Sequence, residues 1–238
     1  MPLPKISTPT YELEIPSTKK KIRYRPFLVK EEKILIIAME SQSDTEIENA
    51  VKDVLSTCIL TKGVKVDTLS TFDIEYLFLN IRGKSVGEDV EVLVTCPDDD
   101  NTKVPVRINL DDIKIIIHDD HKRDIKLDDS LSMRMRYPSI NEFIKSNFST
   151  SEVKSEDTFD LIISCIEQIF NDEESWSTSD CTKEEMNDFL DQLNSNQFKE
   201  IEKFFDTMPK LSHTLTVNNP NTKVKSDVKL EGLAAFFA

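Results

Sequence analysis

Short alternations of apolar and charged residues mark the first 28 positions of the chain. Tyr11–Ile15 and Lys21–Arg25 each alternate, which predicts two strands, and Ser17–Lys20 between them predicts a turn. Prolines recur through the same stretch and exclude a helix, because proline lacks an amide hydrogen and fixes its own backbone angle. We expect an extended hairpin arm that is either solvated or bound to a partner.

Helical periodicity follows the arm. A first helix is expected from Val29, and the apolar run Ile34–Met39 leaves it without a polar face, which predicts burial on several sides. A second helix carries its apolar positions, Cys58 among them, on one face at a spacing of about 3.6 residues. A third begins at the capping-box-like segment Ser70–Asp73, with Gly83 as its expected end.

Patterns of period two return after the third helix. Residues 90–95 and 104–110 alternate around a turn, which predicts a β-hairpin. Residues 113–117 and 125–127 predict a second strand pair across the turn His118–His121.

The remaining segments alternate between helix and turn signals. Pro138 favours the first position of a helix, and the clearest apolar stripe predicts a helix over Ser155–Phe170. An acidic loop around the single tryptophan, Trp176, follows it. Thr182 and Glu185 form a capping box that opens a further helix.

The C-terminal residues combine a hairpin with an apolar tail. A last helix stops before Pro209, and the alternation beyond it predicts a β-hairpin followed by a short tail helix. The tetrapeptide Asn-Thr-Lys-Val at residues 101–104 recurs at 221–224, which raises the hypothesis that the two hairpins are similar modules.

These patterns predict an α+β chain that is mainly α-helical. Its 238 residues are enough for one large domain or two small ones. The expected segments are an extended N-terminal arm (1–28), a helical segment (29–87), a β-hairpin module (88–128), an acidic helical segment (129–208) and a C-terminal hairpin with apolar tail (209–238).

Charge narrows the function classes. The chain has 30 basic and 44 acidic side chains, a net charge of −14, which excludes general coating of nucleic acid by phosphate neutralisation. The charge is uneven: residues 1–37 hold 8 basic and 4 acidic residues, whereas residues 152–191 hold 2 basic and 13 acidic residues. Opposite patches of this kind can steer protein partners or pair chains head to tail.

The sequence shows no membrane-spanning or secretory pattern and no paired-cysteine motif. The longest apolar run has six residues, against the ~20 that a membrane helix needs, and the first residues do not form a secretory signal. We therefore expect a soluble protein without membrane contact. The four cysteines (Cys58, Cys96, Cys165 and Cys181) form no CxxC pair, which is typical of reduced thiols in a cytoplasm.

Candidate chemistry is sparse. Cys96 resembles half of a zinc knuckle, but Asp99 stands where the second cysteine would be. His118 and His121, with two aspartates between them, could hold a metal or act in acid–base catalysis, an alternative that Cys96 would join. Serine-hydrolase and Walker motifs are absent, so we expect no enzymatic activity, no catalytic residue and no cofactor.

Partner-binding residues are expected at both ends of the chain. The terminal segment ends on two phenylalanines, which are unfavourable in water, so the tail either folds back onto its domain or docks into another protein. The expected contact residues are Tyr24, Arg25 and Phe27 in the arm and Leu230, Leu233, Phe236 and Phe237 in the tail.

Three segments of the sequence, in order, resemble the baseplate hub subunit family of T-even-type myovirus phages. They are PKISTPTYEL with YRPFLVKEEK (within 4–33), FDIEYLFL with IR and KSVGE (within 72–88), and LEGL with FF (within 230–237). The resemblance extends over nearly the full length. It implies a late protein of a contractile-tailed phage, either a hub subunit or a hub assembly chaperone, with other hub and tape-measure proteins as partners and no catalytic residues.

Three functions are therefore open. The first is a non-enzymatic hub subunit or assembly factor, present in the host cytoplasm during assembly and, for a subunit, in the virion baseplate; self-association is left open. The second is a metal-binding module or enzyme using His118, His121 and Cys96. The third is an acidic mimic of nucleic acid that uses residues 152–191 to occupy a basic groove.

Overall fold

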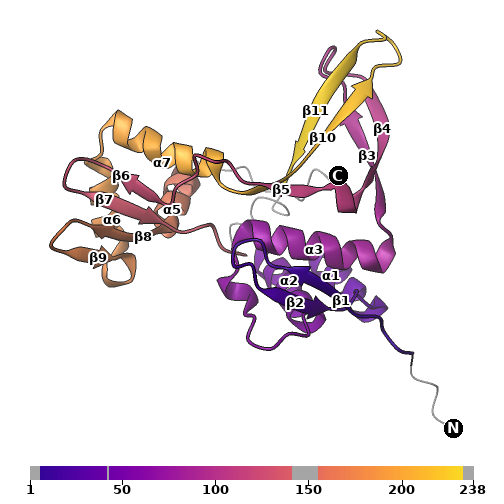
Figure 1. The fold of residues 1–238 in the computed structure, drawn as a ribbon, viewed down its shortest axis with the longest axis horizontal. Coiled ribbons are helices and arrows are strands. Elements are labelled where there is room, and N and C mark those ends of the chain that lie inside the picture. The colour runs from indigo at the N-terminus through magenta and orange to yellow at the C-terminus, as the bar shows by residue number, and fades with distance from the viewer. Residues whose placement is uncertain (1–5, 42, 141–154, 233–238) are drawn as a thin grey trace. The chain divides into compact units, whose positions relative to one another are not determined.

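A computed structural model describes residues 6–41, 43–140 and 155–232 (Figure 1). The chain forms two compact units, and each combines segments that are distant in sequence. Unit 1 consists of Met1–Ile116, Ser139–Ser149 and Lys210–Ala238, and unit 2 of Ile117–Pro138 and Thr150–Pro209. Strand pairing joins residues far apart along the chain, so each unit includes parts of several of the five consecutive segments expected from the sequence.

The predicted N-terminal hairpin is present in unit 1. Strand β1 (Tyr11–Glu14) pairs antiparallel with β2 (Lys21–Tyr24). Ile15, Ile22 and Tyr24 are fully buried in the core of unit 1. The hairpin is therefore packed on its unit along one face, since alternate side chains of a strand point to the same side.

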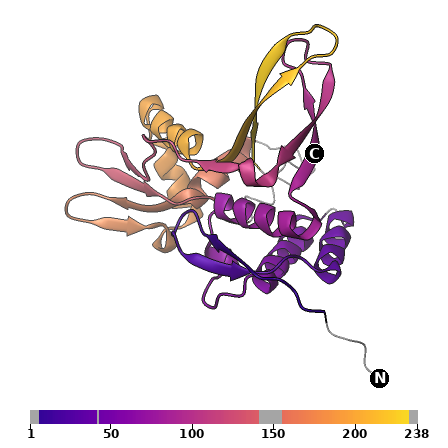
Figure 2. The same ribbon diagram turned by 45° about the vertical axis from the view of Figure 1, so that its right-hand side comes forward.

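Three α-helices follow the hairpin: α1 (Val29–Glu40), α2 (Asp44–Cys58) and, after the short 3-10 helix η1 (Val66–Thr68), α3 (Thr71–Val86). Cys58 is in the core, as predicted. The prediction that α1 is buried on several sides is wrong. The helix packs on α2 (Figure 2). Only Glu31 and Ala38 of α1 are buried and Leu35 is partly buried, whereas its other apolar side chains are exposed: Val29, Ile34, Ile36, Ile37 and Met39.

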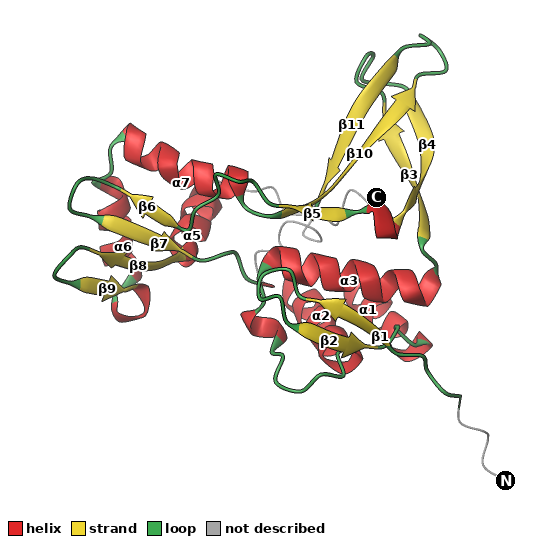
Figure 3. Cartoon of the chain, viewed as in Figure 1, coloured by secondary structure: helices red, strands yellow, loops and turns green. Residues whose placement is uncertain are grey.

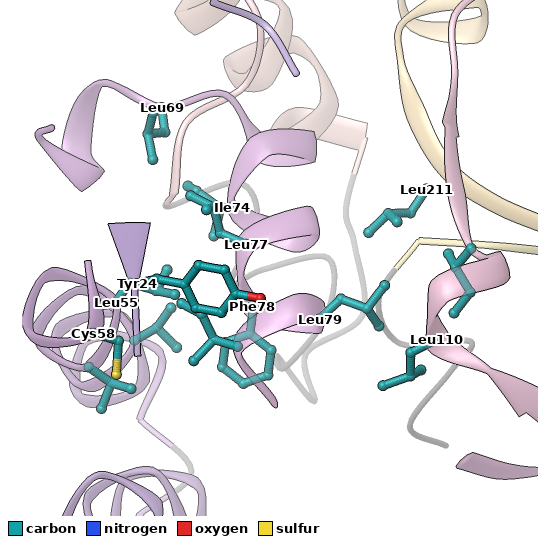
Figure 4. Packing of buried hydrophobic residues seen from close by; sticks show 14 of the residues in the cluster. Tyr24, Leu55, Cys58, Leu69, Ile74, Leu77, Phe78, Leu79, Leu110 and Leu211 are labelled. Atoms are coloured by element: carbon teal, nitrogen blue, oxygen red, sulfur yellow. The ribbon is translucent and has the colours of Figure 1, made fainter. Parts of the chain in front are cut away.

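Helix α3 is central to the core of unit 1. Its buried residues face Tyr24, Leu55 and Cys58 on one side and Leu110 and Leu211 on the other (Figure 4).

The expected helix end at Gly83 is wrong, because α3 continues through it. A Cβ at Gly83 would lie 3.1 Å from Leu110 Cδ1, so the glycine permits close packing inside the helix. The C-cap is Gly87, whose φ of 133° strains a residue with a side chain.

Two further hairpins complete unit 1, and they lie side by side in Figure 1. Strands β3 (Asp89–Thr95) and β4 (Lys103–Asn109) pair as predicted, and the 3-10 helix η2 (Leu110–Asp112) follows them. Strand β10 (Lys210–Asn218) lies between β11 (Lys225–Glu231) and β5 (Lys114–Ile116). The second strand pair predicted across His118–His121 is wrong, because β5 pairs with the distant β10 instead.

Unit 2 packs three helices and one sheet (Figure 3). The antiparallel sheet has the order β6 (Asp124–Lys126), β7 (Ser132–Met135), β8 (Ile166–Phe170) and β9 (Ser175–Ser177). The helices are α5 (Ser155–Cys165), α6 (Lys183–Asp191) and α7 (Ser195–Thr207), with the 3-10 helix η3 (Thr178–Asp180) before α6.

One helix prediction in unit 2 is wrong at its end. The helix expected over Ser155–Phe170 stops at Cys165, and the chain runs directly into β8. Ile166 and Ile169 are buried as strand residues, because β8 pairs with β7 on one side and β9 on the other. Trp176 therefore belongs to β9 and not to an acidic loop.

The mixed α+β class is confirmed, whereas the prediction of a mainly helical chain is not. The capping box of Thr182 and Glu185 is present at α6. The helix expected after Pro138 lies mostly outside the described residues, as does the predicted tail helix. No helix in the described part of the chain has the length and apolar character needed to cross a membrane.

Candidate partner-binding surfaces

Tyr24 is a core residue. Its side chain is 2% exposed, and its ring lies 5.7 Å from the ring of Tyr11. Burial raises the pKa of its hydroxyl. Alternation along β2 turns Tyr24 into unit 1, and its contact with a partner stays a prediction.

Arg25 is engaged within unit 1. Its Nη2 lies 2.8 Å from Glu31 Oε1, and its Nη1 donates to the carbonyl of Pro26. Glu31 is 3% exposed, and its Oε2 accepts a hydrogen bond from the backbone N–H of Leu28 at 2.9 Å. Burial alone would raise the pKa of Glu31, but hydrogen bonds from Arg25, Leu28 and Lys30 outweigh it and lower the pKa to about 2. This pair fixes the first turn of α1 to the hairpin.

Phe27 and Leu230 also make contacts inside unit 1. The backbone N–H of Phe27 donates to Ser85 Oγ at 2.6 Å, and its ring meets Phe78 edge-on at 5.5 Å. Leu230 is partly buried against the core. Leu233, Phe236 and Phe237 lie outside the described residues, so their role in partner binding stays a prediction.

Exposed cations lie on the N-terminal hairpin and on the segment that follows α2. We define the basic patch as Lys19, Lys20, Lys21, Arg23, Lys62 and Lys65, all of which are exposed. Two hydrogen bonds hold its two parts together: the backbone N–H of Arg23 donates to the side-chain Oγ1 of Thr61, and the backbone N–H of Leu60 donates to the carbonyl of Arg23, each at 2.8 Å. Glu12 and Glu14 stand opposite Arg23 and Lys21, so the uncompensated charge is that of the four other lysines.

A buried carboxylate anchors the patch. Asp73, at the start of α3, is fully buried and accepts hydrogen bonds from Ser17 N–H at 2.9 Å, from Ser17 Oγ and from Ser70 Oγ. Ser17 opens the hairpin turn that carries Lys19 and Lys20. The sequence shows Ser70 and Asp73 as a helix start but gives no sign of the bond to Ser17.

Some acidic residues of unit 2 make ion pairs or cap a helix, and three others lie together at a turn. Asp160 pairs with Lys183 at 2.8 Å and Glu167 with Arg123 at 2.6 Å, while Glu185 caps α6. Asp172, Glu173 and Glu174 are exposed at the turn between β8 and β9. The acidic segment is therefore part of a folded unit, and three of its exposed carboxylates lie together at this turn.

His121 has a structural setting. Its Nδ1 lies 3.0 Å from Thr207 Oγ1 and its Nε2 3.0 Å from the Tyr137 hydroxyl, and its ring packs against Tyr137 and Phe204. Because Thr207 Oγ1 donates its only hydrogen to the carbonyl of Lys203, Nδ1 of His121 must be the donor and Nε2 the acceptor from Tyr137. Burial lowers the pKa of His121.

The proposed metal ligands are not brought together. His118 is exposed, His121 is bound to Tyr137 and Thr207, and Cys96 is a buried residue of unit 1. Within the described residues, no group of three or more His, Cys, Asp or Glu side chains could hold a metal ion.

The tips of the β3–β4 and β10–β11 hairpins of unit 1 are bonded to each other. Asn219 is fully buried, and its Nδ2 donates to Asp98 at 3.1 Å and to Asp99 at 3.0 Å. Asp99 accepts from the backbone N–H groups of Asn101 and Thr102, and Asn219 accepts likewise from Asn221 and Thr222. The repeated Asn-Thr dipeptide thus has the same turn role in both hairpins, and Asn219 is a residue that the sequence did not single out.

Helix α1 presents the main exposed apolar surface of unit 1. Val29 is 80% exposed, and Ile34, Ile36, Ile37 and Met39 are 45–54% exposed. A soluble protein rarely leaves such a cluster in water without a partner. This is the surface that the sequence had assigned to the core.

Comparison with known proteins gives one family. A family model described as T4 bacteriophage base plate protein matches residues 8–238, which include all of unit 2 and nearly all of unit 1. No curated protein and no solved structure matches the chain.

Proposed function

The chain belongs to the T4 bacteriophage base plate protein family, and from this premise we propose that it is a hub subunit or hub assembly factor that binds other baseplate proteins. Family membership gives it a structural or assembly role in a phage tail. The finer assignment to the hub rests on the three sequence segments that resemble hub subunits. Tape-measure and hub proteins are the proposed partners, and the proposed role involves no enzymatic chemistry.

The basic patch is the observation that best supports binding of a protein partner. A chain with a net charge of −14 repels other acidic proteins at long range, so a local cluster of cations is where an acidic segment can approach. Lys19, Lys20, Lys62 and Lys65 have no ion pair with any described residue. Because Asp73 fixes the hairpin turn, the backbone that carries Lys19 and Lys20 is held in place before binding, which favours specific contact.

Co-expression tests the proposal. The full chain should retain one or more hub or tape-measure proteins of the same phage in a pull-down. The variant Lys19→Glu/Lys20→Glu/Lys62→Glu/Lys65→Glu should lower that binding at least ~10-fold at low salt, and less at high salt, because screening weakens exposed charges.

A matched control separates local from global charge. Lys103→Glu/Lys122→Glu/Lys199→Glu/Lys225→Glu makes the same change in net charge at exposed positions elsewhere and should bind normally. Equal loss in both variants would reject the patch. Absence of any bound baseplate protein, together with normal tails in a deletion phage, would reject the hub function.

Mass spectrometry of purified virions distinguishes the two forms of the proposal. A hub subunit should be present in the particle at a fixed ratio to other baseplate proteins. An assembly factor should be absent from the particle although the deletion phage makes defective tails.

A further inference from the structure

The outward face of α1 has a definite order. Val29, Lys33, Ile36, Ile37 and Glu40 recur at the spacing of one helix face. All five are exposed, whereas Glu31 and Ala38 on the opposite side are buried. The last four of these positions are a cation, two isoleucines and an anion along the helix.

This order of side chains is complementary to the same order read in the opposite direction, as in an antiparallel pair of identical helices. Turning a second α1 end for end about the midpoint between Ile36 and Ile37 places Ile36 opposite Ile37, and Lys33 opposite Glu40. A twofold axis makes each contact twice, which is the rule for an interface between identical surfaces. We infer that the outward face of α1 binds a second copy of this chain, with the two helices antiparallel.

The charges on this face favour a second copy of α1 in the antiparallel orientation. A parallel pair would bring Lys33 near Lys33 and Glu40 near Glu40, which is repulsive at this spacing. Lys33 and Glu40 make no ion pair with any other described residue, so both are free to pair across the axis. The face carries one charge of each sign, so contact there adds little to the repulsion between two acidic chains.

The hydrophobic contribution comes from the isoleucines. Ile36 and Ile37 are 51% and 54% exposed, and an antiparallel pair removes both from water on each copy. A helix of 12 residues is ~18 Å long, which limits the contact to the small end of specific interfaces. We therefore expect a weak dimer with a dissociation constant in the micromolar range, on the order of 10 μM.

Sedimentation of the purified full chain over a range of concentrations tests this inference. The wild-type chain should shift from monomer to dimer as concentration rises. Lys33→Glu and Glu40→Lys should each weaken the dimer about fivefold or more, because each variant replaces two attractive contacts by two repulsive ones. The double variant Lys33→Glu/Glu40→Lys should restore wild-type affinity, and this restoration is specific to the antiparallel pairing.

Two further variants keep the test decisive. Ile36→Asp should abolish the dimer while the far-ultraviolet circular dichroism is unchanged, since the side chain is exposed in the monomer. Lys199→Glu, an exposed change on α7, should leave the dimer intact.

The inference is overturned if the wild-type chain stays monomeric up to about 1 mM, or if the double charge variant is no better than the single ones. A second outcome also overturns it: the wild-type chain does not self-associate, and Ile36→Asp abolishes binding of a hub protein in the pull-down. The outward face of α1 would then bind that protein and not a second copy. Reversal of the basic patch should leave dimerisation unchanged, so failure of the proposed hub function is measured separately.

Discussion

Units 1 and 2 are each held together by polar contacts of different kinds. Unit 1 uses buried polar groups with complete partners: Glu31 with Arg25, Asp73 with Ser17 and Ser70, and Asn219 with two aspartates. Unit 2 uses a half-buried aromatic cluster around His121 and ion pairs exposed to water. Because a polar contact is worth more when its loss strands a buried partner, single polar substitutions should destabilise unit 1 more than unit 2.

The largest effect is expected from Glu31→Ala. The change leaves the guanidinium of Arg25, 12% exposed, without its carboxylate, and should cost about 3–5 kcal/mol. Urea unfolding followed by circular dichroism measures this loss. Trp176, the single tryptophan, lies in unit 2 and reports that unit separately by fluorescence.

Lys30→Ala is the matched control for Glu31→Ala. Lys30 lies 3.3 Å from the same carboxylate but is 66% exposed, so its loss should cost less than about 1 kcal/mol. Similar losses for the two variants would show that burial does not set the energy of this cluster.

The second largest loss of unfolding free energy, about 2 kcal/mol, is expected from Asp73→Ala. The change removes the acceptor of Ser17 and Ser70 and leaves their donors unpaired. The exposed Asp67, which pairs with Lys52, offers the comparison Asp67→Ala, with an expected loss below about 1 kcal/mol. Asp73→Ala should also weaken binding at the basic patch. A variant that loses stability but binds hub proteins normally would separate the anchor from the patch.

Acid should affect the units in different pH ranges. Burial lowers the pKa of His121 below its ordinary value of 6.5, so its neutral form contributes stability above that pH, and the contribution is lost as the pH falls further. The nearby charges of His118 and Arg123 act in the same direction, and Asp120 opposes them. Glu31, with a pKa of about 2 against an ordinary 4.5, contributes stability above pH 4.5 that is lost only as the pH approaches 2.

Equilibrium unfolding at several pH values measures this difference. Between pH 7 and 5, the urea midpoint of Trp176 fluorescence should fall, and His121→Gln should remove that dependence. The part of the circular dichroism transition assigned to unit 1 should change little over the same range. A pH response that survives His121→Gln would assign it to another group.

The smallest effect is expected from Lys183→Ala. Its ion pair with Asp160 joins side chains that are 64% and 50% exposed, so the loss should be below about 0.5 kcal/mol and smaller still in high salt. Thermal unfolding at low and high salt measures it. A loss comparable to that of Asp73→Ala would remove the contrast between the two units.

Local patterns in the sequence predict much of this fold. Capping residues locate the starts of α3 and α6, and alternation locates the three hairpins, because these signals act over a few residues. The pairing of β5 with β10 is not predictable in this way, since the partner strand begins at Lys210. The change from α5 to β8 at Ile166 depends likewise on neighbours in the sheet, which override helical periodicity.

The candidate surfaces were less predictable than the fold. An apolar helix such as α1 reads as core whether its partner is in the same chain or in another, so the pattern alone misplaced Ile36 and Ile37. Tyr24 of the arm was predicted as a partner contact, and its side chain faces inward in this unit. Net charge by segment did locate the basic region, whose lysines are exposed.

The interleaved order of the two units has a consequence for biosynthesis. Every residue of unit 2 leaves the ribosome before β10, which supplies Leu211, Leu215 and Val217 to the core of unit 1. We expect the core of unit 1 to stay incomplete, and β5 to lack its partner strand, until residues 210–238 have been synthesised. Unit 2 can already fold by then. A variant without this hairpin would therefore lack three core residues of the unit that carries both the basic patch and α1, and that unit should be less stable.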